Sequence, residues 1–298
     1  MILTKVSLHN DYILVETEII DLSKLRKGKI SIMYYIIEIH NRPKYINKLS
    51  KFFNNLVLYF HNDPLDMENS KSKIDRIQLL NKTKKIIFNS EWTKKRFLLN
   101  LKLDKSQKKK ILIIHQSTNK VKISLNDKQN NIIFVGRLNK SKGFDIFGKT
   151  IIKILDRHNN WNATVIGDEP REKYFFKHKN LSILGFKKHD FILKSLAKSS
   201  ICVVCSRWEE PFGRIALEAS SRGCAVIITN KGGLKEAATN PLVINDLNEK
   251  TLYNSINRLI SNYDLRKKLQ KKSLRNFYLT NEFISKKIDT YRKEIFKS

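Results

Sequence analysis

The stretch Trp208-Glu-Glu-Pro-Phe-Gly-Arg-Ile-Ala-Leu-Glu-Ala-Ser220 stands between two apolar runs, residues 201–205 and 225–228. The proline near its start and Gly223 just after it are helix start and stop signals, so we predict a short helix over residues 213–222. The apolar runs are typical of buried strands. The order strand, loop, helix, strand is the repeating unit of an α/β fold.

Two glutamates of this stretch stand eight residues apart. Glu210 would lie in the loop between strand and helix, and Glu218 inside the helix. This loop is at the carboxyl edge of the sheet, where doubly wound folds bind their ligands. Carboxylates there can accept hydrogen bonds from hydroxyl groups such as those of a sugar. Taken alone, a pair of glutamates on a helix is more often solvated.

Further runs of β-branched residues alternate with amphipathic segments from about residue 30 onward. Several runs are continuously apolar, which is typical of strands buried on both faces of a parallel sheet. We therefore predict an α/β fold with doubly wound parallel sheets. Strands are expected at residues 30–39, 56–60, 85–88, 111–114, 132–135, 163–166, 182–184, 201–204, 225–228 and 242–244, and helices at 144–157 and 190–198.

A polar segment, residues 117–130, separates two series of strands. A chain of 298 residues has room for two domains. We predict an N-terminal Rossmann-like domain over residues 1–125 and a C-terminal one over 126–298. The C-terminal domain would end in a helical tail from residue 249, with the last helix near residues 282–296.

The composition is that of a globular protein with a large positive charge, +30 from 58 basic and 28 acidic residues. Of the basic residues 44 are Lys, whereas nucleic-acid recognition relies on Arg, so we expect no specific nucleic-acid partner. The basic run over residues 94–122 has two interpretations, contact with anionic lipid head groups or a solvated surface. Without an apolar run of about 18 residues or a secretory leader, we expect a cytoplasmic protein, peripheral at most to the inner membrane.

The three cysteines are too few for a disulfide framework. Cys202 and Cys205 form a C-x-x-C, but residues three apart on a strand point to opposite faces. No second pair of ligands follows at zinc spacing. We expect buried thiols and no metal site.

Two other loops follow predicted strands and carry positive charge or glycine. Gly136-Arg137-Leu-Asn-Lys-Ser-Lys142-Gly143 precedes a helix and places two cations where a helix N-terminus favours an anion. It is neither a Walker A loop nor a dinucleotide fingerprint, and it would suit a diphosphate. In Lys231-Gly232-Gly233-Leu234, backbone N–H groups can approach a phosphate or sugar, although a Gly-Gly pair alone is more often a turn.

These motifs resemble, in order and spacing, the retaining glycosyltransferases of family 4, the glycosyl transferases group 1 of GT-B fold. The resemblance covers about residues 130–240 and rests most on Glu210-Pro-Phe-Gly-x-x-x-Leu-Glu218 and Gly232-Gly-Leu-x-Glu236. It implies two Rossmann-like domains facing a cleft, of which the second holds a nucleotide-diphospho-sugar donor. It also implies no cofactor and no obligatory metal, because cationic side chains take the metal's place.

The resemblance assigns roles residue by residue. Arg137 and Lys142 would neutralise the diphosphate, Glu218 would hold the ribose hydroxyls, and Glu210 would contact the donor sugar. The backbone at Gly233 and Leu234 would lie beside the sugar and phosphate. The candidate donor site comprises Arg137, Lys142, Gly185, Phe186, Glu210, Phe212, Gly213, Glu218, Gly233 and Leu234.

The first domain resembles the family more loosely. Two predicted strands end in His40-Asn-Arg-Pro and His61-Asn-Asp-Pro. The resemblance makes His61 a catalytic candidate near the reacting centre, together with Glu210, Arg137 and Lys142. His40 is more simply a strand-end residue that bonds to nearby loops.

One departure from the family concerns the start of the chain. The family opens with a Gly-rich loop and further strand-helix units, whereas residues 1–25 contain no glycine. We therefore expect a shortened first domain, which leaves open a naturally short domain, a truncated chain or a protein with little transfer activity.

The resemblance implies sugar transfer with retention of configuration to a glycan or lipid-linked acceptor, in cell-surface polysaccharide or lipopolysaccharide biosynthesis. The alternative is a nucleotide-sugar-binding protein, or half-enzyme, with little activity of its own.

Overall fold

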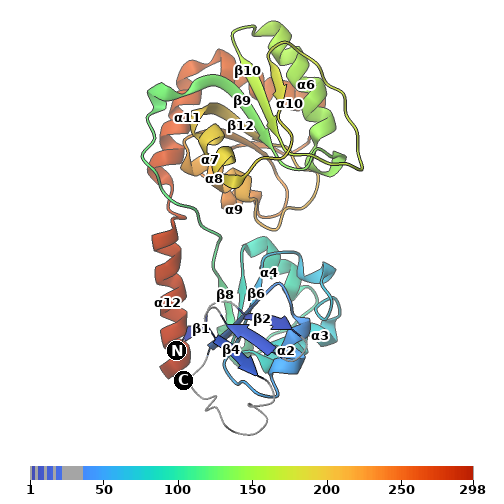
Figure 1. The fold of residues 1–298 in the computed structure, drawn as a ribbon, viewed down its shortest axis with the longest axis vertical. Coiled ribbons are helices and arrows are strands. Elements are labelled where there is room, and N and C mark those ends of the chain that lie inside the picture. The colour runs from blue at the N-terminus through green and yellow to red at the C-terminus, as the bar shows by residue number, and fades with distance from the viewer. Residues whose placement is uncertain (1, 4–5, 10–11, 16–17, 22–35, 298) are drawn as a thin grey trace. The chain divides into compact units, whose positions relative to one another are not determined.

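Two compact units make up the chain in the computed structural model, which describes residues 2–3, 6–9, 12–15, 18–21 and 36–297. Unit 1 comprises Met1–His115 and Ile284–Ser298, and unit 2 comprises Gln116–Phe283 (Figure 1). Each unit is built around a parallel sheet with helices, which confirms the predicted α/β fold class.

Unit 2 contains a six-stranded parallel sheet in the order β11-β10-β9-β12-β13-β14. Numbered along the unit, this is the order 3-2-1-4-5-6 of a doubly wound nucleotide-binding fold. The direction in which the sheet grows therefore reverses between β9 and β12. The strands are β9 Gln129–Val135, β10 Asn162–Ile166, β11 Leu181–Ile183, β12 Ser199–Val204, β13 Ala225–Thr229 and β14 Leu242–Ile244.

Helices cover both faces of this sheet. On one face, α6 and α10 contact each other and bury Ile151 and Ile256 against Phe134 and Val203. On the other face, α7 and α8 pack on β9, β12 and β13, and α11 contacts α8 and β13 (Figure 1). Burial on both faces explains why these strands are continuous apolar runs. The helices are α6 Phe144–Arg157, α7 His189–Lys198, α8 Arg214–Ser221, α9 Leu234–Ala237, α10 Glu249–Ser261 and α11 Tyr263–Asn276.

Unit 1 contains a second parallel sheet in the order β1-β5-β6-β7-β8. One face of it packs on helices through a cluster that includes Ile39, Leu58, Phe60 and Phe97. The strands are β1 Ile2–Leu3, β5 Ile36–His40, β6 Leu56–Phe60, β7 Lys85–Phe88 and β8 Ile111–Ile113. The helices are α2 Lys44–Leu49, α3 Lys73–Lys82, α4 Glu91–Leu98 and α5 Lys105–Lys109, followed at the end of the chain by α12 Asn281–Lys297.

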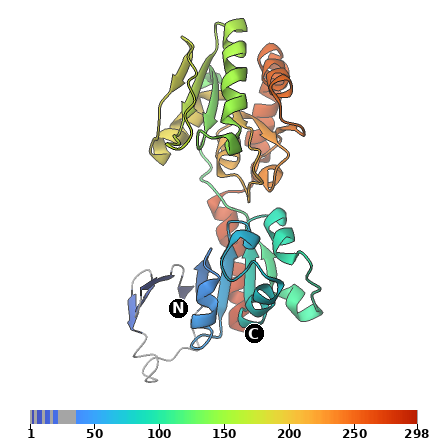
Figure 2. The same ribbon diagram turned by 90° about the vertical axis from the view of Figure 1, so that its right-hand side faces the viewer.

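The last helix, α12, lies along the sheet of unit 1 (Figure 2). Arg292 of α12 makes two hydrogen bonds of 2.8 Å to Glu38 on β5, and the Tyr291 hydroxyl donates to the same carboxylate. Tyr59 on β6 lies 2.5 Å from Tyr291, hydroxyl to hydroxyl. Glu38 and Tyr59 alternate along their strands with the apolar residues of the other face, so α12 covers the face opposite to α2 and α3.

A small antiparallel sheet, β2-β3-β4, was not predicted. Its strands are Val6–His9, Tyr12–Val15 and Glu18–Asp21. The expectation of a missing Gly-rich loop concerns this part of the chain, of which several residues lie outside the described ones. The predicted strand at 30–39 is described only from Ile36 onward, as β5.

The units divide the chain differently from the predicted domains, 1–125 and 126–298. The division falls at His115, and the tail from Ile284 belongs to unit 1. Unit 1 is interrupted at His115, before the predicted boundary at residue 125, because the connecting segment packs on unit 2. There the Leu125 carbonyl accepts a 2.7 Å hydrogen bond from Lys267. The chain returns to unit 1 at Ile284 because α12 contacts Glu38 of that unit.

None of the helices in the described part of the chain is both long and apolar enough to cross a bilayer.

The three cysteines, Cys202, Cys205 and Cys224, are free and buried, as predicted. Burial raises the pKa of all three thiols, that of Cys205 to about 12. Unfolded thiols ionise near pH 8.5. The stability gained by keeping these thiols neutral is therefore full below about pH 8.5 and is lost as the pH rises toward the folded-state pKa.

We expect the native protein at about pH 9 to react with a disulfide reagent such as DTNB far more slowly than the unfolded protein, because the thiolate is the reactive form. Release of the coloured thiolate is the measurement. Three fast-reacting thiols in the native state would contradict the burial.

Candidate functional site

The candidate site lies at the carboxyl edge of the unit 2 sheet, where the loops after β9, β12 and β13 meet. Between β9 and β12 the order of the sheet reverses, and doubly wound folds bind their ligands at such a point. Arg137 and Lys142 are on the first loop, Glu210 is on the second, and Gly233 is on the third. Folding thus brings together residues that the sequence analysis took from three separate motifs.

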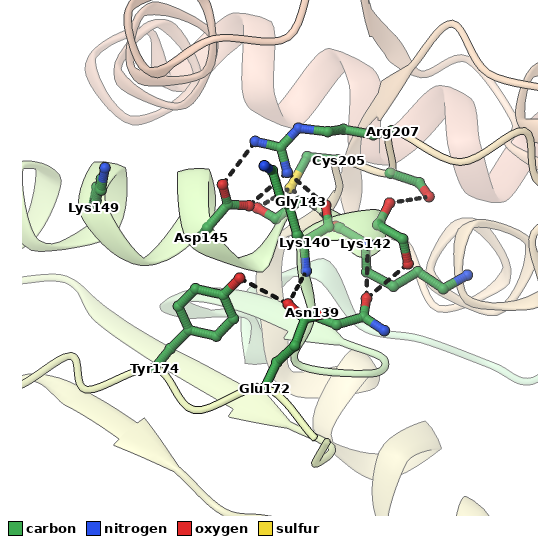
Figure 3. Close-up of polar contacts among 12 residues, drawn as sticks. Asn139, Lys140, Lys142, Gly143, Asp145, Lys149, Glu172, Tyr174, Cys205 and Arg207 are labelled. Carbon is green, nitrogen blue, oxygen red and sulfur yellow. Dashed lines mark hydrogen bonds and ion pairs between the residues drawn. The ribbon is translucent and has the colours of Figure 1, made fainter. Parts of the chain in front are cut away.

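The loop after β9 is held in one conformation by its own side chains (Figure 3). The Asn139 carboxamide oxygen accepts a 3.0 Å hydrogen bond from the backbone N–H of Lys142 and one of 2.8 Å from the Ser141 hydroxyl. Gly143 ends the turn in the left-handed conformation, with φ +73°. A Cβ at Gly143 would lie 2.0 Å from the backbone oxygen of Cys205, so only glycine fits.

Arg207, after β12, fastens this loop to α6. Its guanidinium makes two hydrogen bonds to Asp145, of 2.6 and 2.8 Å, and another of 2.5 Å to the Lys140 carbonyl (Figure 3). Partial burial raises the pKa of Asp145, but the hydrogen bonds from Arg207 outweigh it and lower the pKa. The loops after β9 and β12 therefore form one rigid surface.

Lys142 and Glu210 form an ion pair at the reversal point of the sheet. Their side chains are 24% and 11% exposed, so the pair is largely withdrawn from water. The Lys142 ammonium also lies 4.9 Å from the ring centre of Trp208, in cation–π geometry. A cation and a carboxylate at this point can contact the anionic and the hydroxyl parts of one ligand.

The glycine loop after β13 is bound to the backbone of the Glu210 loop. Gly233 N–H donates to the Glu210 carbonyl at 2.7 Å, and Gly232 N–H donates to the Glu209 carboxylate at 2.5 Å. Gly232 has φ +56°, and a Cβ there would lie 2.0 Å from the backbone carbonyl oxygen of Glu210. The loop can approach this closely only because it lacks side chains.

The Gly232→Ala substitution is expected to lower unit 2 stability by about 2–4 kcal/mol, because the new methyl group overlaps backbone atoms that cannot yield. Gly185→Ala is the matched control. Gly185 also has positive φ, +67°, but no atom lies within 4 Å of its added Cβ. It should cost only about 1 kcal/mol. Urea unfolding of both variants is the measurement, and equal losses would show that close approach is unimportant.

Glu218, in the second turn of α8, is almost fully buried, with 1% of its side chain exposed. One of its oxygens accepts hydrogen bonds from Arg214 at 2.8 Å and from His189 at 3.0 Å. Both partners are about half exposed, so the buried carboxylate is linked to the surface through two polar side chains. Neither partner was predicted from the sequence. The i,i+4 spacing of Arg214 was an available signal, whereas His189 comes from α7.

The other residues of the predicted donor site differ in whether their side chains are exposed or buried. Arg137 is exposed and forms no hydrogen bond or ion pair with any residue that the structure describes. Phe186 is 73% exposed, next to Gly185. Phe212 and Leu234 are buried, so only their backbone could face a ligand.

Gly213 begins α8 with φ +108°. Its missing side chain leaves room for Leu234, whose nearest methyl would lie 2.5 Å from an added Cβ. This packing holds the start of α8 against the glycine loop.

In unit 1, His61 follows β6 and His40 ends β5, both at the carboxyl edge. Their rings share a 2.9 Å hydrogen bond between His40 Nδ1 and His61 Nε2. The backbone N–H of His61 donates to Asn41 at 2.7 Å, and Asn89 donates to the His61 carbonyl at 2.9 Å. The second histidine is thus a direct partner of the predicted one.

Within the described residues, no three His, Cys, Asp or Glu side chains come close enough together to hold a metal ion.

Comparison with known proteins identifies the family of unit 2. Residues 115–275 match the family described as Glycosyl transferases group 1. The chain is 30% identical over 167 residues to the uncharacterized glycosyltransferase MJ1607 of Methanocaldococcus jannaschii, a match to 52% of this chain and 42% of that protein. It is 29% identical over 161 residues to spore coat protein SA of Bacillus subtilis, covering 48% of this chain and 43% of that one. The matches thus span less than half the length of these relatives.

Solved structures share the fold. Alr3699/HepE of Anabaena, in complex with UDP and glucose, superimposes with a TM-score of 0.69 at 16% identity, covering 92% of this chain and 81% of the other. A glycosyltransferase of Rickettsia africae gives 0.71 at 21% identity, covering 93% and 79%. Identities this low support the shared fold of parallel-sheet units, and nothing finer.

Proposed function

Because the chain belongs to the glycosyl transferases group 1 family, we propose that it transfers a sugar from a nucleotide-diphospho-sugar to an acceptor hydroxyl with retention of anomeric configuration. In this reaction the bond between the sugar carbon and the diphosphate oxygen breaks, and its electron pair leaves with the diphosphate. The acceptor oxygen forms its bond to the same carbon on the same face. The acceptor proton passes to the leaving phosphate.

The observation that carries this proposal is the ion pair of Lys142 with Glu210 at the reversal point of the unit 2 sheet. Lys142 would meet the negative charge that develops on the diphosphate, and Glu210 would accept hydrogen bonds from the sugar. Arg137, exposed on the same loop, would supply the second cation. Such fixed charges stabilise a transition state without reorganisation, and they support a reaction without an obligatory metal.

Two further residues would hold and orient the reactants. Glu218, with Arg214 and His189 beside it, would accept hydrogen bonds from the ribose. In unit 1, His61, whose ring shares a hydrogen bond with His40, is the catalytic candidate.

The donor and acceptor follow by analogy. Because Alr3699/HepE was solved with UDP-glucose, UDP-glucose is the first donor to test. A glycan or lipid-linked acceptor in cell-surface polysaccharide or lipopolysaccharide biosynthesis would suit the family.

Calorimetric titration of the full chain with UDP, GDP, ADP and their sugar conjugates tests donor binding. We expect selective binding of one nucleotide, and about 100-fold weaker binding by Glu218→Ala, because hydrogen bonds to a buried carboxylate are strong. The matched control is Glu294→Ala, which removes the same charge from an exposed residue of α12. Equal binding by Glu218→Ala and wild type would exclude the ribose role.

Turnover tests the enzymatic part separately. Arg137→Ala is expected to slow transfer at least 100-fold, because it removes a positive charge that would offset the negative charge developing on the leaving diphosphate. Undiminished transfer would contradict the assignment of the loop after β9. Donor binding without turnover by the purified chain would favour the half-enzyme instead.

A further inference from the structure

A basic groove lies at the amino edge of the unit 2 sheet, away from the loops that follow β9 and β12. Its place is fixed by Gln270 of α11, which donates a 2.9 Å hydrogen bond to the carbonyl of Ser200 at the start of β12. The groove has a volume of about 800 Å³. It is lined by Ile123, Leu125, Asp264, Lys267, Lys268, Lys271, Lys272, Leu274 and Arg275.

A hydrogen bond and apolar contacts hold the residues that line the groove in place. Lys267 donates a 2.7 Å hydrogen bond to the Leu125 carbonyl and so ties α11 to the segment before β9, which runs beside it in Figure 1. The side chains of Leu125 and Leu274 both approach Gly223, at 3.2 and 3.0 Å from the position of an added Cβ. The two leucine side chains therefore meet beside Gly223 and form an apolar part of the groove lining.

The charged residues that line the groove are mostly basic. Its basic residues recur three and four positions apart along α11, so they share one face of the helix. Five cations face one carboxylate, that of Asp264. Lys268, Lys271 and Lys272 form no hydrogen bond or ion pair with any residue in the described part of the chain. Their charge is therefore available to a partner.

The opposite face of α11 is committed to the core of unit 2. Arg266, Gln270 and Ser273 are buried there, and each donates hydrogen bonds to backbone carbonyls. The helix is thus anchored by one face while its lysine face stays open. Substituting the lysines should leave the fold intact.

We propose that this groove docks on the surface of an anionic phospholipid bilayer, with phosphate head groups between the lysines of α11. Lys267 to Arg275 extend over about 12 Å of helix, which suits several head groups rather than one phosphate. Lysine is a point charge without the planar fork that selects single phosphates. The apolar walls at Ile123, Leu125 and Leu274 would contact the glycerol and upper acyl carbons, with the lysine stems lying across them.

The same lining argues against single-stranded nucleic acid as the partner. Such sites place aromatic rings beside their cations, so that bases can stack. No aromatic residue is among its described lining residues, and the ring of Tyr263, whose centre is 5.5 Å from the Lys267 ammonium, lies outside the lining. The donor loops lie at the other edge of the sheet, so docking here leaves them accessible.

Sedimentation with vesicles tests the proposal. The full chain should bind vesicles of phosphatidylcholine with phosphatidylglycerol and not vesicles of phosphatidylcholine alone. The triple variant K268Q/K271Q/K272Q should partition roughly 100-fold more weakly, because each lysine near an anionic surface contributes a severalfold factor. Circular dichroism checks that the variant is folded.

The matched control is K102Q/K105Q/K109Q, which removes three exposed lysines from the other basic surface, in residues 94–122. It should keep most of the vesicle binding. The proposal is overturned if wild type does not bind anionic vesicles, if both triple variants lose binding equally, or if inorganic phosphate or polyuridylate at low millimolar concentration displaces the vesicles. Because no donor is present, failure of the proposed transfer reaction would not affect this result.

Discussion

Replacing Lys142 with Met is expected to lower the stability of unit 2 by about 3 kcal/mol and to slow sugar transfer at least 100-fold. The stability loss arises because the Glu210 carboxylate, 11% exposed, keeps its charge and loses its ion-pair partner. The contact of the ammonium with the Trp208 ring is lost as well. The loss of rate arises because the leaving diphosphate would lack a fixed cation.

A double substitution separates the structural role of the pair from its chemical role. Lys142→Met/Glu210→Gln removes both charges, so its stability should return to within about 1 kcal/mol of wild type. Transfer should stay low, because neither the cation nor the carboxylate is present. Glu210→Gln alone should be slow and should lose less stability than Lys142→Met, since Lys142 is the more exposed partner and the amide oxygen can still accept its hydrogen bond.

Urea unfolding and initial rates with UDP-glucose are the two measurements. Recovery of both stability and rate in the double variant would mean that the pair is only structural. A Lys142→Met variant that transfers at the wild-type rate would remove Lys142 from the mechanism.

Local sequence patterns were sufficient to predict most of the second unit. The helix expected at residues 144–157 is α6 with the same bounds, since its apolar positions recur at helical spacing and Gly143 precedes it. The strands at 225–228 and 242–244 lie within one residue of β13 and β14. In β13 burial on both faces leaves a continuous apolar signal.

In the first unit the predicted strands at 56–60 and 85–88 are β6 and β7 with the same bounds, but the start of the chain was less predictable. In the sheet β2-β3-β4 the strands are short and paired antiparallel, and polar residues such as Ser7, His9 and Glu18 interrupt the apolar ones. The buried Glu38 in β5 has no local explanation either. Its partner Arg292 is 254 positions away in the chain.

The candidate site, too, was predictable from the sequence only in part. Each motif was visible locally, because strand-end glycines and charges mark loops. Which side chains meet was not, since Lys142 and Glu210 are 68 residues apart and are brought together by the parallel pairing of β9 with β12. The contact of His189 with Glu218 depends on how α7 packs against α8, which no spacing in the sequence encodes.

Replacing Arg292 with Met is expected to destabilise unit 1 by about 3–5 kcal/mol, because it leaves the Glu38 carboxylate, 3% exposed, without its two hydrogen bonds from the guanidinium. Tyr291 and Tyr59 remain but cannot neutralise the charge. Burial, and after it the charge of Glu38, raises the pKa of both hydroxyls well above the usual value. Their contribution to stability is full below about pH 10 and is lost as the pH rises further.

Three variants make this prediction specific to the buried charge. Lys293→Met removes a neighbouring cation that is exposed on α12, so it should change stability by less than about 0.5 kcal/mol. Arg292→Met/Glu38→Gln removes the unpaired charge and should recover more than half of the loss. Hydrogen exchange of β5 and β6 amides locates the effect in unit 1. The outcome that would contradict the prediction is equal protection of these amides in Arg292→Met and Lys293→Met. In that case the apolar residues Ile284 and Ile295 hold α12 in place, and the network around Glu38 does not determine its docking.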